Sequence, residues 1–163
     1  MRDPDLFVLA RALHVLGVVL WIGGVAFVTT VLLPALRRTK DPARRLELFE
    51  SLEGRFAWQA RIVTLVTGLT GFYMLHYLDA WSRYQSLAYW WIHLMTLVWF
   101  LFTMVLFVLE PLVLHRWFHE RARANSERAF RLAQVMHVVL LTLSLVAVVG
   151  AVAGSHGYAF GPR

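Results

Sequence analysis

Residues 6–36 read LFVLARALHVLGVVLWIGGVAFVTTVLLPAL, and Arg11 is the one side chain among them that carries a fixed charge. A helix needs about 20 consecutive, mostly apolar residues to cross the hydrocarbon core of a bilayer. Because this stretch exceeds that length and is almost uncharged, it predicts a membrane-spanning helix over about Leu6–Leu36.

Three further stretches have the same character. Hydrophobic residues make up 59% of the 163-residue chain, whereas a soluble domain typically has about 45–50%. We therefore expect an all-α membrane protein, with one domain over residues 1–163 that folds as an antiparallel bundle of four transmembrane helices. The four expected spans are about 6–36, 56–78, 87–114 and 130–154.

The basic residues predict how the bundle sits in the membrane. Cytoplasmic loops carry an excess of Lys and Arg. Twelve of the 16 basic residues lie in or beside the segments that join spans one to two and three to four, namely Arg37, Arg38, Lys40, Arg44, Arg45, Arg55, Arg61, Arg116, Arg121, Arg123, Arg128 and Arg131. We therefore expect these two segments to be cytoplasmic and both termini to be extracytoplasmic, in a bacterial-type inner (cytoplasmic) membrane.

Composition argues against nucleic-acid binding and against cofactor sites that need cysteine. The formal charge of +6 comes from residues between apolar spans, so topology accounts for it better than nucleic-acid binding does. The chain has no cysteine, which excludes thiolate zinc sites, iron–sulfur clusters and covalent c-type haem. Within the first connecting segment, Asp41–Glu53 has apolar residues at helical spacing and predicts a short surface helix.

Three of the seven histidines are expected to lie near the extracytoplasmic ends of different spans, at about one depth: His14, His76 and His93. Helix bundles commonly hold cofactors between side chains of facing helices, and two neutral imidazoles can bind the two axial positions of a haem iron. The alternative is three interfacial histidines bonded to water, carbonyl groups or lipid headgroups. Arg11 lies one turn outward from His14, where it could pair with a haem propionate or reach a lipid phosphate.

Other polar groups within the spans have simpler expectations. Pro111 should distort the third span because it lacks a backbone N–H. Glu110 could be protonated, or could pair with Arg61 at a similar depth on the second span, and we favour the ion pair. For His137 on the fourth span we favour a packed, hydrogen-bonded side chain over a ligand.

Residues 11–24, with Arg11-Ala-Leu-His14 followed by Trp21-Ile-Gly-Gly24, resemble the opening helix of the copper-resistance D (CopD) family. The same pattern recurs in the related HemJ-type protoporphyrinogen oxidases, and Pro34–Arg38 resembles the close of that helix. The resemblance implies a four-helix membrane domain in which His14 binds haem or metal. HemJ-type proteins typically carry a Lys in the third span, where this chain has His93, and a His fits a second axial ligand.

These features together predict an integral membrane protein that binds haem b, with His14 and His93 as axial ligands, His76 as the competing second ligand and Arg11 at the propionates. Its expected role is electron transfer or redox chemistry with a quinone or small oxidant, which makes it an oxidoreductase if it is an enzyme. Its expected partners are the lipid bilayer and a quinone or redox protein, and self-association stays open. The alternatives are a copper transport or tolerance component, a protoporphyrinogen oxidase, and an assembly subunit without a cofactor.

Overall fold

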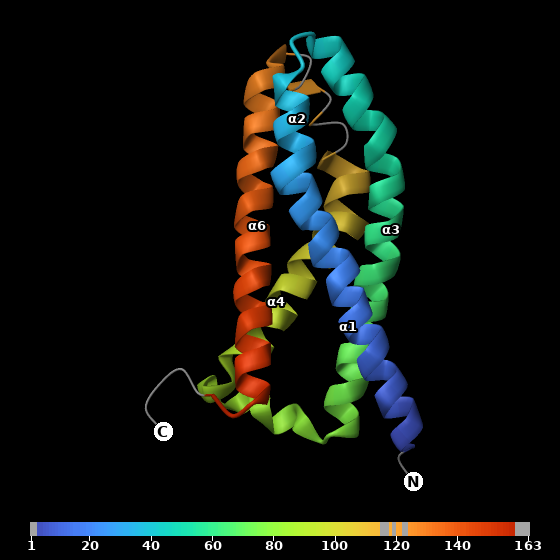
Figure 1. The fold of residues 1–163 in the computed structure, drawn as a ribbon, viewed down its shortest axis with the longest axis vertical. Helices are drawn as coiled ribbons and strands as arrows, with labels where there is room; N and C mark the ends of the chain where they lie inside the picture. The colour runs from blue at the N-terminus through green and yellow to red at the C-terminus, as the bar shows by residue number, and fades with distance from the viewer. Residues whose placement is uncertain (1–2, 115–117, 119, 122–123, 159–163) are drawn as a thin grey trace.

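The computed structural model describes residues 3–114, 118, 120–121 and 124–158, and all the regular structure within these ranges is helical. The described residues form four long helical segments (Figure 1). Their parts are α1 (Pro4–Phe27), the π-helix η1 (Val28–Leu32) and α2 (Leu33–Arg38); then α3 (Pro42–Tyr77); then the short 3₁₀ helices η2 (Ala80–Gln85) and η3 (Leu87–Tyr89); then α4 (Trp90–Met104) and the π-helix η4 (Val105–Leu114); then α6 (Ser126–Ser155).

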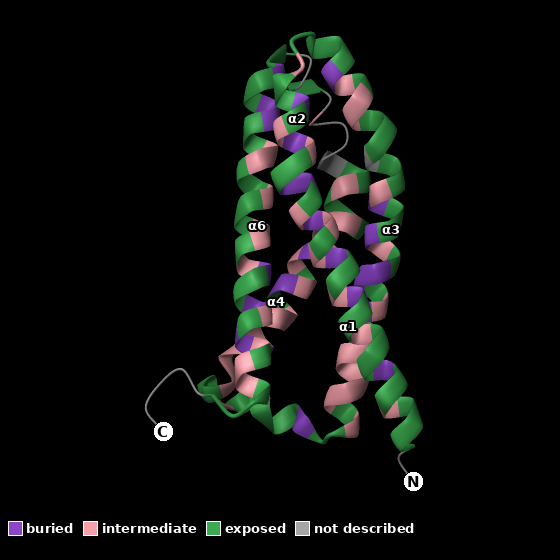
Figure 2. Cartoon of the chain, viewed as in Figure 1, coloured by how far each residue is buried: buried purple, intermediate pink, exposed green. Residues whose placement is uncertain are grey.

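Three helical stretches among the described residues are long and apolar enough to cross a membrane, namely Pro4–Arg38, Leu87–Leu112 and Ser126–Ser155. Large apolar side chains are exposed along them, such as Val19 at 61% and Val149 at 61%. Figure 2 shows exposed residues along the full length of the outer helix faces. Exposure of so many apolar side chains is unfavourable in water, so lipid must cover these faces.

The helix boundaries at the first connection differ from those expected. The segment Asp41–Glu53 is not a separate surface helix, because α3 runs without a break from Pro42 to Tyr77. Asp41 caps its N-terminus by accepting a hydrogen bond from the Ala43 N–H, and residues 43–77 contain no proline and no helix-ending turn. The connection from α2 to α3 is therefore only a few residues long.

The four segments form two hairpins. The first hairpin consists of α1, η1 and α2 packed against α3, and the second consists of α4 and η4 with α6. The start of α1 and the end of α6 lie at the same end of the bundle as η2 and η3 (Figure 1). We call this end the η2 end. The two hairpins separate towards the η2 end and come together at the opposite end.

The opposite end contains the apolar cluster with the least exposed residues. We call it the Arg45 end, because the Arg45 guanidinium lies there over the Phe130 ring. Val28, Leu33, Leu36, Ala129 and Phe130 are buried together there, and Leu33 and Phe130 have no exposed surface. A second cluster around Trp21, Val25, Val63, Val98 and Phe102 lies nearer the middle of the bundle. The hairpins are therefore joined by apolar packing at the Arg45 end and the middle.

Candidate functional site

His14 is held against α3 by hydrogen bonds. Its Nδ1 lies 2.9 Å from the Thr67 carbonyl oxygen and 3.2 Å from Thr70 Oγ1. A carbonyl oxygen can only accept, so Nδ1 carries the proton, and in the neutral imidazole Nε2 then has the free lone pair. Histidines that bind metals are typically oriented in this way, by donating the other ring N–H to a carbonyl or carboxylate.

Small residues bring α1 and α3 close together around His14. A Cβ atom at Gly71 would lie 3.1 Å from His14 Cε1, and one at Gly17 would collide with the Thr67 side chain. Glycine is therefore needed at both positions for the helices to approach this closely. The contact fixes the His14 ring between its own helix and α3, and it leaves no space for a flat macrocycle between these two helices.

His93 lies near the start of α4 and contacts η2 and η3. Its Nε2 is 3.0 Å from the Tyr84 carbonyl oxygen, and its Nδ1 is 3.3 Å from the Tyr89 carbonyl oxygen. The Tyr84 ring packs edge-on against the imidazole at 5.4 Å between centroids, and its hydroxyl lies 2.6 Å from Thr96 Oγ1. A neutral imidazole can donate to one of the two carbonyl groups only, so His93 could bind a metal through Nε2 only after leaving Tyr84.

His76 and Arg11 are both exposed at the η2 end. Within the described ranges, neither side chain makes a hydrogen bond or ion pair. His76 is five residues beyond Gly71, the residue that contacts His14, which places it about 8 Å further out along α3. The expected common depth therefore does not hold for His14 and His76.

His14 and His93 lie on different hairpins at a similar depth. Trp21 of α1 meets Phe102 of α4 in an edge-to-face contact with centroids 4.8 Å apart. His14 is seven residues outward from Trp21, and His93 is nine residues outward from Phe102. Helix rise converts these separations into about 11 Å and about 14 Å. The structure does not bring the two imidazoles into contact, but it places them at corresponding levels of the two hairpins.

The polar pair expected on the second and third spans is confirmed. Arg61 on α3 forms an ion pair with Glu110 on η4 through Nη2, and its Nε donates to the Leu106 carbonyl oxygen at 3.0 Å. His137 on α6 is also hydrogen-bonded, since its Nδ1 lies 2.9 Å from the Ala133 carbonyl oxygen. Among the described residues, no three His, Asp or Glu side chains gather to form a metal site, although a haem iron needs only one or two axial ligands.

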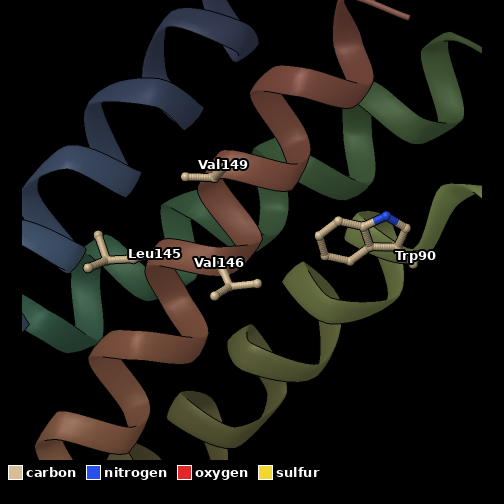
Figure 3. A pocket seen from close by; sticks show the side chains of 4 residues that line it. All are labelled: Trp90, Leu145, Val146 and Val149. Carbon is tan, nitrogen blue, oxygen red and sulfur yellow. The ribbon is translucent and has the colours of Figure 1, made fainter. Parts of the chain in front are cut away.

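A recess of about 440 Å³ lies between α4 and α6 (Figure 3). Its lining consists of the Trp90 ring and three aliphatic side chains, Leu145, Val146 and Val149. All three aliphatic residues are exposed on the face that lipid covers. An apolar recess of this kind suits an alkyl chain and lacks the polar groups that would orient a reacting molecule.

Sequence reasoning identified His14 but missed the groups that orient it. A carbonyl group leaves no signal in the sequence, so the Thr67 and Tyr84 acceptors could not have been found. The spacing of Gly68 and Gly71 on the second span was a usable signal, because paired small residues mark close helix contacts in membranes. Gln134, whose Nε2 donates to the Thr29 carbonyl oxygen at 2.7 Å, was also missed.

No protein-family model matches the sequence, and no curated protein and no solved structure matches it either. The fold and the geometry around His14 are therefore the basis for the function proposed next.

Proposed function

We propose that this chain is an integral membrane protein with four spans that holds haem b near the η2 end of the bundle. Besides the three apolar stretches described above, the second half of α3 is the remaining span, which is the second in chain order. At 36 residues α3 is about 54 Å long, which exceeds the hydrocarbon thickness of about 30 Å. Because α3 packs along α1 through Gly17 and Gly71, and α1 is apolar enough to cross, α3 crosses beside it.

The orientation of His14 is the observation that carries the proposal. Its Nδ1 proton is directed to the Thr67 carbonyl oxygen, which leaves Nε2 as the metal-binding nitrogen, and Gly71 buttresses the ring. The donor set fits a haem iron, which commonly takes a neutral imidazole as an axial ligand. In this proposal His14 is the ligand that anchors the cofactor to the first hairpin.

The second ligand comes from His93 or His76, and we favour His93. The close contact between α1 and α3 excludes a macrocycle between the helices that carry His14 and His76. His93 belongs to the other hairpin at a similar level, so a ring between the hairpins would have one imidazole on each side. Binding through His93 Nε2 costs the hydrogen bond to the Tyr84 carbonyl group.

Arg11 completes the proposed site. Arg11 is exposed one turn outward from His14, where a guanidinium can pair with a propionate at the aqueous edge. When bound, haem b supplies one-electron redox chemistry. Its partner would be a quinone or small oxidant at the membrane surface, or a redox protein.

The test is the visible spectrum of the detergent-purified protein after expression with an adequate haem supply, together with its iron and copper content. We expect the sharp reduced-state bands of six-coordinate b-type haem and stoichiometric iron. The variant His14→Ala should lose most of its haem because a direct ligand is removed. The variants His93→Ala and His76→Ala should differ, since only the true second ligand is needed for the six-coordinate spectrum.

His137→Ala is the matched control, because the His137 imidazole also lies within the bundle but bonds to its own helix at Ala133. The visible spectrum of this variant should equal that of the wild-type protein. The haem proposal fails if the wild-type protein carries no iron. It also fails if His14→Ala, His93→Ala and His76→Ala all keep the wild-type spectrum. Stoichiometric copper without iron would favour copper handling instead.

A further inference from the structure

The two π-helical segments of the bundle share one feature of sequence, a proline that interrupts their hydrogen bonds. In a π-helix the N–H of residue i bonds to the carbonyl group of residue i−5, as the Leu33 N–H does with Val28 in η1. The next bond in this register would run from residue 34 to Thr29, but Pro34 has no N–H. In η4 the corresponding bond would run from residue 111 to Leu106, and Pro111 has no N–H either.

Each of the two carbonyl groups that this register leaves without a backbone donor receives a side-chain donor. Gln134 Nε2 donates to the Thr29 carbonyl oxygen at 2.7 Å. Arg61 Nε donates to the Leu106 carbonyl oxygen at 3.0 Å. A buried carbonyl group without a partner is costly, and more so in lipid, where water cannot replace the donor.

The two donors cross between the hairpins in a reciprocal way. Gln134 lies on α6, the second helix of the second hairpin, and it bonds to η1 in the first hairpin. Arg61 lies on α3, the second helix of the first hairpin, and it bonds to η4 in the second hairpin. Each hairpin therefore supplies the donor that the proline removed from the other.

The surroundings of Gln134 show what its contact contributes. Its Oε1 is buried and has no partner among the described residues, which is unfavourable for a polar atom in a core. An aliphatic residue would avoid that penalty, so the bond from Nε2 to Thr29 is the interaction that favours Gln here. Arg61 has a second role in its ion pair with Glu110.

We propose that Gln134 and Arg61 are a reciprocal pair of braces that replace the N–H groups missing at Pro34 and Pro111 and so fix the two hairpins against each other. The braces join the hairpins near the π-helical segments, whereas the η2 end is the part where the hairpins separate (Figure 1). Gln134 and Arg61 therefore set the position of one hairpin relative to the other, and this role does not depend on what the η2 end binds.

The test is a double-mutant cycle on Gln134 and Pro34, read as the Tm of the purified protein in detergent. Gln134→Leu in the natural background should lower Tm by about 3–8 °C, because the Thr29 carbonyl group loses its donor. In the Pro34→Ala background the backbone can supply a donor again, so the same replacement should cost much less. The exposed Gln59, replaced by Leu, should have the same small effect in both backgrounds.

The Arg61 brace is tested in the same way with Pro111→Ala. This cycle uses a Glu110→Gln background throughout, so that replacing Arg61 by Met does not leave an unpaired carboxylate. Additive effects in both cycles would overturn the proposal. If Gln134→Leu alone does not fold, recovery of folded protein in Gln134→Leu/Pro34→Ala supports the brace, and failure to recover it contradicts the brace.

A distance measurement separates a brace from a simple contribution to stability. The chain has no cysteine, so spin labels can be attached to cysteines introduced at Val8 on α1 and Val152 on α6, which are 64% and 56% exposed. Gln134→Leu should broaden the distance distribution between the labels, and Pro34→Ala should narrow it again. An unchanged distribution would contradict the proposal, and neither outcome depends on whether haem binds.

Discussion

At the scale of single residues, Arg45 shows how a buried charge can be accommodated without a carboxylate. The residue is 8% exposed, and its guanidinium donates to the Thr39 carbonyl oxygen at 2.7 Å and to Ser126 Oγ at 3.1 Å and lies over the Phe130 ring. The carbonyl groups at the C-terminal end of a helix carry partial negative charge. Arg45 therefore satisfies the end of α2 and ties the α2–α3 connection to the start of α6.

Replacement of Arg45 by Met should lower the free energy of unfolding by about 2–3 kcal/mol, because the carbonyl groups and Ser126 lose their charged donor. The neighbouring Arg44 is the matched control. Its side chain is 58% exposed and pairs with Glu47 on the surface, and such pairs contribute roughly 0–1 kcal/mol. Unfolding in denaturant should separate the two variants, and equal losses would argue against the buried contacts of Arg45.

At the scale of helices, aromatic rings packed onto glycines hold the elements together. The Trp99 ring of α4 lies against Gly68 of α3, and its Nε1 donates to the Thr64 carbonyl oxygen at 2.9 Å. In the second hairpin, Trp90 and Trp91 of α4 lie against glycines of α6 in the same way. These contacts bring large rings close to a neighbouring backbone, so they tolerate no added side-chain atom without a shift.

Gly68→Ala should therefore destabilise the protein by about 1–3 kcal/mol, since the new Cβ atom would collide with the Trp99 ring. Gly23→Ala is the control, because a Cβ atom there meets nothing within 4 Å, and alanine is the better helix former. Thermal unfolding and tryptophan fluorescence would measure both effects. A Gly68→Ala protein as stable as Gly23→Ala would show that the helices move apart freely at this point.

At the scale of the whole molecule, the two ends of the bundle differ in charge and in packing. Five basic residues lie at the connection from α2 to α3, at the Arg45 end: Arg37, Arg38, Lys40, Arg44 and Arg45. The start of α1, η2, η3 and the end of α6 share the other end (Figure 1). The excess of Lys and Arg marks the cytoplasmic side of a membrane protein. We therefore predict that the η2 end and both termini lie outside the cytoplasm.

A reporter enzyme fused after Arg163 tests this orientation. A reporter that is active only outside the cytoplasm should be active, and a reporter that needs the cytoplasm should be inactive. The same pair fused within the connection from α2 to α3, after Lys40, should give the opposite pattern. Cytoplasmic activity of the fusion after Arg163 would reverse the orientation and place His14 near the inner surface.

The sequence by itself determined the all-helical membrane class. Long, almost uncharged stretches such as residues 6–36 leave a chain few alternatives, because every backbone polar group in lipid must be bonded within its own segment. The pairing of Arg61 with Glu110 could also be predicted, since two opposite charges at similar depths in lipid are strongly driven to meet. His14 stood out for the related reason that ionisable groups are rare within spans.

Only the tertiary structure decided how these residues are used. The carbonyl group that orients His14, the carbonyl groups that hold His93 and the outward position of His76 depend on how α1, α3 and η2 pack. Backbone acceptors are the same at every position of a sequence, so the sequence does not mark them. The continuation of α3 through the first connection, and the donors that Gln134 and Arg61 supply opposite Pro34 and Pro111, likewise arise only when the two hairpins meet. Short-range patterns encode each helix, whereas the partner of each polar group is set by contacts between residues far apart in the chain.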